Sequence, residues 1–150
     1  MKPSQKCINL IKQFEGLCLK SYICPAGKVS IGYGATFYED NKPITIGDLI
    51  SIKRAEDLLK FHADIIAAKL PKLNINQNQF DAIISFVYNV GISNFLKSTL
   101  YRIMKQNSND DLIGDEFMKW TKARVNGELK TLKGLVNRRK AETNLYYEQN

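Results

Sequence analysis

The feature that most constrains the fold is FDAIISFVYNVG, residues 80–91, which is apolar nearly all the way round. A helix with that pattern has no polar face to turn toward water, so other helices must surround it. Asn76 and Gln79 form an approximate capping box before the segment, and Gly91 ends it. The pattern therefore predicts a helical lobe built around this segment.

Further helices are predicted on both sides of it. Apolar residues at helical spacing predict a first helix from Pro3 to Glu15, with Pro3 at the first helical position and Gly16 ending it. Ser51 is a good N-cap for a long helix that runs to Pro71. Shorter helices are predicted around residues 94–106, 110–122 and 132–147, with ARVNGELK (123–130) as a loop or hairpin.

The residue pattern is no longer helical between Lys20 and Ile46. Glycines at 27, 32 and 34 punctuate an alternation of Val29, Ile31 and Tyr33, which predicts short strands and tight turns. NKPITIG (41–47) is expected to be the last short strand and a turn. The class is therefore α+β in one domain, residues 1–150. Residues 16–50 are expected to form the mainly β lobe, 51–71 the linking helix, and 1–15 with 72–150 the helical lobe.

The cysteines do not suggest a metal site or a disulfide framework. Cys7, Cys18 and Cys24 are an odd number without metal-ligand spacing, and His62, the one histidine, lies far from them in sequence. A chain of 150 residues with 44% hydrophobic residues can bury a core without disulfides. We expect no metal and no cofactor, synthesis in a reducing compartment, and buried side chains at Cys7 and Cys18.

The net charge of +7 indicates an acidic partner or, alternatively, a plain solvated surface. A nucleic acid, an anionic membrane face and an anionic envelope polymer all fit this charge. The first residues lack the apolar region of a secretory signal. The longest uncharged run, residues 82–96, is shorter than the ~20 residues that span a bilayer. We therefore expect a soluble protein, made in a cytoplasm, without stable membrane insertion.

Glu15 is the first candidate for chemistry. It ends the predicted first helix just before a glycine, and Phe14 and Leu17 flank it. Partial burial between them favours the protonated carboxyl group and suits a general acid. A carboxylate at a helix edge is otherwise an ordinary solvated group.

The segment FEGLCLKSYICPAGKVSIGYGAT (14–36) resembles the signature of bacteriophage-type lysozymes, the endolysins of glycoside hydrolase family 24. That signature has a Glu, an Asp or Cys nine positions on, a Thr six positions further, and an IG-aromatic-G segment. Here those places hold Glu15, Cys24 and Ser30, followed by residues 31–34. The resemblance continues in order through residues 78–91, 98–104, 116–120 and 132–142.

The resemblance implies two lobes joined by a long helix, with a cleft between them. It also implies hydrolysis of the β-1,4 bond between N-acetylmuramic acid and N-acetylglucosamine in peptidoglycan. By position Glu15 is the acid, and Cys24 and Ser30 match the second and third catalytic places. Arg138 matches the basic partner of the catalytic Glu. Tyr88, Asn89 and Thr99 match substrate-binding positions on the helical lobe.

The chain departs from the common pattern in three places: Cys24 for Asp, Ser30 for Thr, and Ala35 where many members have His. A thiol with a reference pKa of about 8.5 is mostly uncharged at neutral pH, so Cys24 does not simply replace a carboxylate. It could serve as a weak base toward water, as a nucleophile or as a spacer, with Ser30 positioning the water.

Two alternatives to an active endolysin follow from these observations. The substitutions favour an impaired lysozyme-like module that only binds wall glycan, whereas the retained Glu15 argues against it. Nucleic-acid binding fits the charge, but no recognisable module is present and the basic residues are dispersed except at NRRK (137–140). We expect a monomeric enzyme that causes host cell lysis, stays in the host cytoplasm until it is released to the wall, and binds no nucleic acid.

Overall fold

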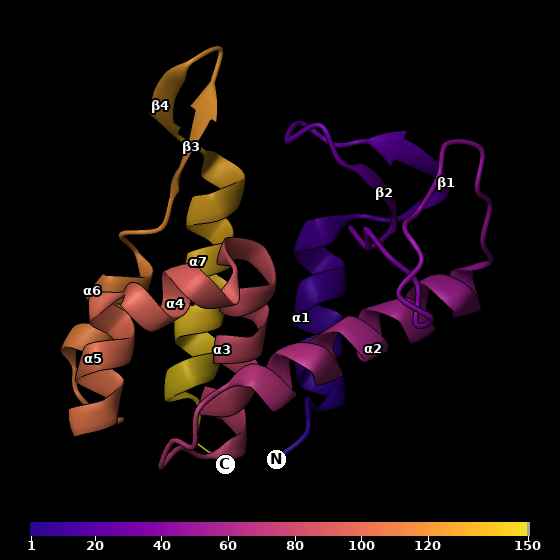
Figure 1. Ribbon diagram of the computed structural model, residues 1–150. Helices are drawn as coiled ribbons and strands as arrows, with labels where there is room; N and C mark the ends of the chain where they lie inside the picture. The colour runs from indigo at the N-terminus through magenta and orange to yellow at the C-terminus, as the bar shows by residue number, and fades with distance from the viewer. Residues whose placement is uncertain (150) are drawn as a thin grey trace.

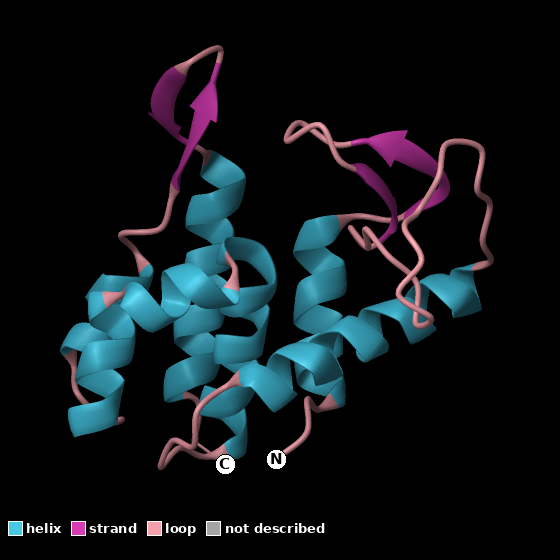
Figure 2. Ribbon diagram, viewed as in Figure 1, coloured by secondary structure: helices cyan, strands magenta, loops and turns pink. Residues whose placement is uncertain are grey.

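The computed structural model describes residues 1–149, which form seven helices and two small antiparallel sheets (Figures 1 and 2). The helices are α1 (Gln5–Glu15), α2 (Ile52–Lys69), α3 (Gln77–Val90), α4 (Ile92–Lys97), α5 (Thr99–Gln106), α6 (Leu112–Phe117) and α7 (Lys133–Tyr147). The strands are β1 (Cys18–Ile23), β2 (Val29–Gly32), β3 (Lys122–Val125) and β4 (Glu128–Thr131). Helices α3 to α7 gather on one side, β1 and β2 lie on the other, and α2 extends under both (Figure 1). This arrangement confirms the predicted α+β class.

Helix α3 is the centre of the helical part, as its apolar sequence predicts. The predicted capping box of Asn76 and Gln79 is present, and Gly91 follows the helix with a φ of 89°. Every side chain from Asn78 to Val87 is buried. Phe86 lies in a cluster of aromatic rings with Phe95, Phe117 and Trp120, so α3 is held by α4, α6 and the turn after α6.

Helices α1 and α2 pack against α3 and connect it to the β1–β2 region. Cys7, Ile8 and Ile11 of α1 share a buried cluster with residues of α2 and α3. The predicted N-cap of α2 is confirmed, because the Ser51 hydroxyl accepts a hydrogen bond from the Arg54 amide. None of the helices in residues 1–149 is long and apolar enough to cross a membrane.

The start of α1 differs from the prediction that placed Pro3 inside the helix. Ser4 is the N-cap, and α1 begins at Gln5. The Ser4 hydroxyl accepts a hydrogen bond from the Lys6 amide, and the Ser4 amide donates to Asp81 Oδ1 at 3.0 Å. The buried Asp81 carboxylate on α3 therefore helps to fix Ser4 as the cap. This contact joins residues far apart in sequence, so a local pattern could not predict it.

Each sheet is a single hairpin. Strands β1 and β2 pair antiparallel with an irregularity between Cys18 and Tyr22. Strands β3 and β4 pair antiparallel and are joined by a turn at Asn126 and Gly127, which have φ of 53° and 81°. An Asn-Gly pair with positive φ is typical of a type I′ turn, so ARVNGELK forms the hairpin rather than the loop.

Four further sequence predictions were wrong in detail. Residues 41–47 form no strand: Phe37 and Pro43 make an isolated bridge, and Asp48 holds the loop by accepting hydrogen bonds from Thr45 and Tyr38. The expected helix 94–106 is divided at Ser98, whose hydroxyl caps α5, and the expected helix 110–122 covers only α6. Cys18 is exposed rather than buried, since it begins the mostly exposed strand β1, whereas Cys7 is buried as predicted.

Candidate active site

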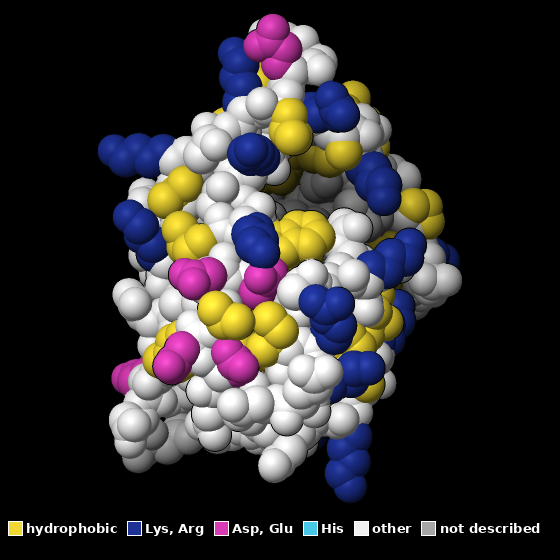
Figure 3. Space-filling view, turned by 90° about the vertical axis from the view of Figure 1, so that its left-hand side faces the viewer, with side chains coloured by type: hydrophobic (Ala, Val, Ile, Leu, Met, Phe, Trp, Pro, Cys, Tyr) yellow, Lys and Arg dark blue, Asp and Glu magenta, His cyan; other side chains and the backbone are white. Residues whose placement is uncertain are grey.

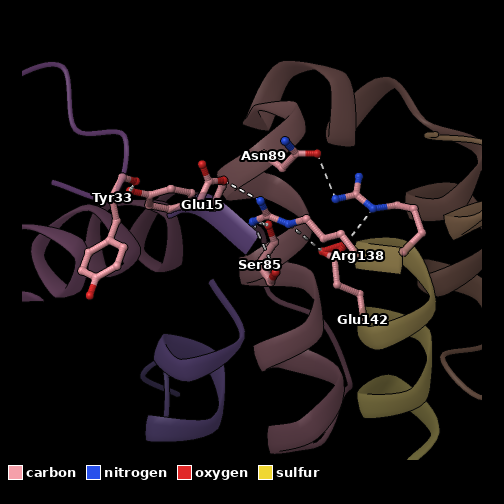
Figure 4. Close-up of polar contacts among 8 residues, drawn as sticks. Glu15, Tyr33, Ser85, Asn89, Arg138 and Glu142 are labelled. Atoms are coloured by element: carbon pink, nitrogen blue, oxygen red, sulfur yellow. Dashed lines mark hydrogen bonds and ion pairs between the residues drawn. The ribbon is translucent and has the colours of Figure 1, made fainter. Parts of the chain in front are cut away.

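Glu15 lies where α1 ends, at the junction of α1 with the β1–β2 region and with α7 (Figure 4). Gly16 follows with a φ of 69°, so the chain turns away sharply after the carboxylate. The Glu15 side chain keeps 21% of its exposure. Its Oε1 accepts a hydrogen bond from Arg138 Nη1 at 2.5 Å, so the structure brings together these two predicted residues.

The second oxygen of Glu15 faces Gly34. A side-chain carbon at Gly34 would lie 3.5 Å from Glu15 Oε2, and the φ of Gly34 is 90°, a region that favours glycine. Glycine therefore leaves this oxygen uncovered. The site thus has a carboxyl group with one oxygen held and the other free to meet a ligand.

Tyr88 joins the helical part to the segment after β2. Its hydroxyl donates a 2.7 Å hydrogen bond to the Tyr33 carbonyl oxygen (Figure 4). Burial raises the pKa of Tyr88, and the negative charge of Glu15 raises it further. Tyr88 and Gly34 both line a hollow of about 230 Å³, together with Thr36, His62 and Ile66 among others. Gly34 therefore both faces Glu15 Oε2 and lines this hollow, although Glu15 itself is not part of the lining.

Arg138 belongs to a buried network of charges between α3 and α7 (Figure 4). Its Nη2 donates to the Ser85 carbonyl oxygen at 3.0 Å, and its Nε lies 4.0 Å from Glu142 Oε2. Arg139 Nε lies 2.7 Å from Glu142 Oε1, and Arg139 Nη2 donates to Asn89 Oδ1 at 2.9 Å. Glu142 is therefore placed between two guanidinium groups, one of which holds Glu15.

The burial of this network changes its titration. Burial raises the pKa of Glu142 to about 7, although Arg139 and Arg138 pull it in the opposite direction. Burial also lowers the pKa of Arg139, which remains a cation because an arginine side chain is not deprotonated in proteins. Arg139, Glu142 and Ser85 were missed in the sequence. The signal was available: Arg138 and Glu142 are four residues apart on one helix, the spacing of an ion pair.

Cys24 and Ser30 lie together on the β1–β2 hairpin. The backbone N–H of Lys28 holds the pKa of the Cys24 thiol below its ordinary value; burial opposes this, and the Ala26 N–H and the Ser30 hydroxyl add to it. Ser30 itself is buried, at 3% exposure. Its hydroxyl therefore faces the thiol and the hairpin interior rather than open water.

Tyr22 links Cys24 to the region of Glu15. Burial raises the pKa of the Tyr22 hydroxyl, and the negative charges of Cys18, Cys24 and Glu15 raise it further. The charges of both predicted catalytic groups therefore raise the pKa of the same tyrosine.

The remaining predicted substrate residues lie in different surroundings. Asn89 is exposed near the end of α3 and is bound to Arg139. Thr99 is the exposed first residue of α5 and lines another hollow with Lys97 and Arg102. Thr99 has no hydrogen bond to the Glu15 network within residues 1–149. Its assignment to the glycan cleft stays a prediction.

A metal ion bound by the part of the chain that the structure describes would need several ligand side chains close together. No group of three or more His, Cys, Asp or Glu side chains there could hold a metal ion. His62 is half-buried, with Nε2 3.0 Å from the Phe37 carbonyl oxygen, and burial lowers its pKa. The prediction that the protein needs no metal or cofactor stays a prediction.

Comparison with known proteins gives a consistent result. A family model described as phage lysozyme matches residues 12–142. An endolysin of Acyrthosiphon pisum secondary endosymbiont phage 1 is 42% identical over 97% of this chain and 98% of its own length. The solved endolysin from Escherichia coli O157:H7 phage FAHEc1 superposes with a TM-score of 0.87 at 34% identity, over 99% of this chain and 94% of that one. The muramidase domain of SpmX from Asticaccaulis excentricus superposes with a TM-score of 0.83 at 31% identity, over 99% of both chains.

Proposed function

The chain belongs to the phage lysozyme family, and on that basis we propose that it is an endolysin in which Glu15 is the acid that cleaves peptidoglycan. The bond we propose is the β-1,4 bond between N-acetylmuramic acid and N-acetylglucosamine. The observation that carries the proposal is the setting of the Glu15 carboxyl group. One oxygen is held by a buried arginine and the other faces a glycine beside a hollow.

The first step we propose is proton donation. Glu15 gives its proton to the glycosidic oxygen that leaves, which lowers the barrier to breaking the bond. Arg138 holds Oε1, so that Oε2 is directed toward the sugar. Tyr88 and Asn89 bind the glycan on the α3 side, and Thr99 is assigned there by resemblance alone.

The second group we propose is Cys24. We propose that its thiol acts at the anomeric carbon of the sugar, as a base toward water or as a nucleophile. The Ser30 hydroxyl assists by a hydrogen bond to the thiol. The lowered pKa of Cys24 supports this role, because a thiolate is a better base and nucleophile than a thiol. A base toward water, a nucleophile and a spacer remain three distinct versions of this step, and substitutions at Cys24 separate them.

The surroundings of the enzyme form a further part of the proposal. The face of the helical lobe seen in Figure 3 carries more Lys and Arg than Asp and Glu side chains, many of them around a hollow below the projecting hairpin. We propose that the +7 charge draws the protein to acidic envelope polymers, and that binding weakens as salt rises. We also propose that it is a monomer, binds no nucleic acid, and waits in the host cytoplasm until it reaches the wall and lyses the cell.

Product chemistry tests the bond. Purified peptidoglycan is digested with the protein, the new reducing ends are reduced with borohydride, and the fragments are identified by mass spectrometry. We expect reduced N-acetylmuramic acid at the new ends. Reduced N-acetylglucosamine, or free peptides, would contradict the proposed bond.

The same preparation tests the binding-only alternative. A module without activity would sediment with the peptidoglycan and release no soluble fragments. Sedimentation without release, in a protein whose thermal unfolding is cooperative, would replace the enzyme proposal with the impaired module.

A further inference from the structure

Two hollows are lined in part by residues of α5, a helix that lies on the side of the helical lobe away from β1 and β2 (Figure 1). One hollow, of about 230 Å³, is lined by residues that include Lys97, Arg102 and Lys105. The other, of about 380 Å³, is lined by residues that include Lys72 and Lys105. Lys105 lines both hollows, and we call the two hollows together the α5 track. No Asp or Glu lines either hollow.

The four cations of the α5 track have no carboxylate partner within residues 1–149. Other cations in residues 1–149, such as Lys20 and Lys133, also lack one, so the track is distinguished by position: its four cations line two hollows that no acid lines. Arg102 and Lys105 are three residues apart on α5 and so share one helix face. Cations gathered without acids repel one another, and an anion placed among them removes that repulsion.

One of the four cations is also held in place. Lys105 Nζ lies 4.9 Å from the centre of the Tyr101 ring, close enough for a cation–π interaction. The ring therefore orients the ammonium group of the one cation that lines both hollows.

The neutral lining of the larger hollow indicates what else the ligand carries. Besides its two lysines, it is lined mostly by amides and a hydroxyl: Asn74, Gln106, Asn107, Ser108 and Asn109. Amide and hydroxyl groups donate and accept hydrogen bonds, which suits a ligand rich in hydroxyl groups. A ligand that alternates anions with hydroxyl-bearing units therefore fits both features.

We propose that the α5 track binds a linear polyol phosphate of the bacterial wall. This rests on the proposed function, which brings the enzyme to that wall. A single-stranded nucleic acid fits less well, because base stacking needs open aromatic faces and Tyr101 is covered by Lys105. No residue that lines the track takes part in the Glu15–Arg138–Glu142 network within residues 1–149. Thr99 lines the smaller hollow, so on this proposal it contacts the polymer and not the glycan at Glu15.

Binding to a defined probe tests the proposal. The probe is a soluble glycerol phosphate oligomer, titrated at low salt into the native chain and two variants. The track variant carries Lys72→Gln, Lys97→Gln, Arg102→Gln and Lys105→Gln. The charge-matched control carries Lys2→Gln, Lys42→Gln, Lys53→Gln and Lys140→Gln, four exposed lysines elsewhere. Cooperative thermal unfolding of each variant is checked first.

We expect the track variant to lose about tenfold or more in affinity, and the control to lose much less. Equal losses in both variants would overturn the proposal, because they would show an effect of net charge alone. No loss in either would also overturn it. Tighter binding of polyuridylate RNA, or of vesicles rich in phosphatidylglycerol, through the same four residues would assign the track to another partner.

Hydrolysis separates this proposal from the proposed function. On peptidoglycan stripped of its anionic polymers, we expect the track variant to match the native chain. On walls that keep the polymer, we expect it to be slower. Loss of activity on the stripped substrate would overturn the proposal, since the track would then belong to the glycan site. If the native chain fails on stripped peptidoglycan, the proposed function is wrong, while the probe titration still decides the track.

Discussion

Glu15 stands between two regions that hold their polar groups in different ways, the α3–α7 interface and the β1–β2 hairpin. At the interface, Arg138, Arg139 and Glu142 are almost fully buried and contact one another. On the hairpin, Cys24 is partly exposed and is held by backbone N–H groups. One side of the candidate site is thus built from helix packing, and the other from a short exposed turn.

The two regions differ in how strongly packing constrains their polar residues. A buried charge that loses its partner destabilises the whole domain, so Arg138 is constrained by packing whatever its part in the proposed reaction. A thiol on an exposed turn touches little, so changing Cys24 alters chemistry and hardly alters stability. Of the three departures from the common family pattern, only Cys24 is partly exposed, whereas Ser30 and Ala35 are buried.

Glu15→Gln gives the largest expected effect on activity. The change keeps an oxygen that can accept from Arg138 and removes the proton donor, so we expect the fold to persist and peptidoglycan release to fall by ~10²–10⁴-fold. Glu128→Gln, on the exposed β3–β4 hairpin, is the matched control and should leave activity unchanged. Native-like activity in a folded Glu15→Gln variant would show that this carboxyl group is not the proton donor.

Arg138→Ala tests the buried side of the comparison. It leaves Glu15 without its guanidinium partner and Glu142 with Arg139 alone, and we expect a loss of ~3–5 kcal/mol in the free energy of unfolding together with a loss of activity. Arg54→Ala, which removes an exposed ion pair with Glu39, should cost only ~0–1 kcal/mol. Urea unfolding of both variants gives the two numbers. Similar losses would show that burial does not distinguish the two ion pairs.

The sequence predicted most of the helical part because local signals and burial agree there. The α3 pattern, its capping box and Gly91, and the Ser51 cap all appear as expected. The misses have two causes. Ser4, and not Pro3, precedes α1, and Asp81 of α3, distant in sequence, binds it. Residues 41–47 are instead shaped by local side-chain hydrogen bonds to Asp48, which compete with strand pairing.

The candidate site was predictable in part for the same reason. Resemblance located Glu15 and Arg138, and the structure brings them into contact. Glu142 and Arg139 were not singled out, because a basic stretch on a helix is usually solvated and only packing against α3 reveals its burial. Thr99 matched by resemblance, but α5 carries it to another hollow.

Substitutions at Cys24 test the exposed side. If the site needs a charge or base facing the sugar, Cys24→Asp should retain or raise activity. If thiolate character matters, Cys24→Ser should lower it by about tenfold or more, because serine is far less acidic. The free energy of unfolding should change by less than about 1 kcal/mol in each case. Cys24→Ala that releases peptidoglycan as fast as the native chain would remove Cys24 from the mechanism.

The smallest expected effect concerns the titration of the Cys24 thiol. The measurement is the rate of alkylation by iodoacetamide against pH, in a Cys18→Ser background that leaves Cys24 as the only exposed or partly exposed thiol. Cys7 does not interfere, since it is fully buried and burial raises its pKa. Because the Lys28 N–H lowers the pKa of Cys24, the thiolate forms at lower pH than in free N-acetylcysteine, and the rate should rise earlier on the pH axis. Adding Ser30→Ala should move the midpoint back up, since the Ser30 hydroxyl also favours the thiolate. A midpoint at or above that of N-acetylcysteine would mean that the hairpin does not activate the thiol, and Cys24 would then act as a spacer.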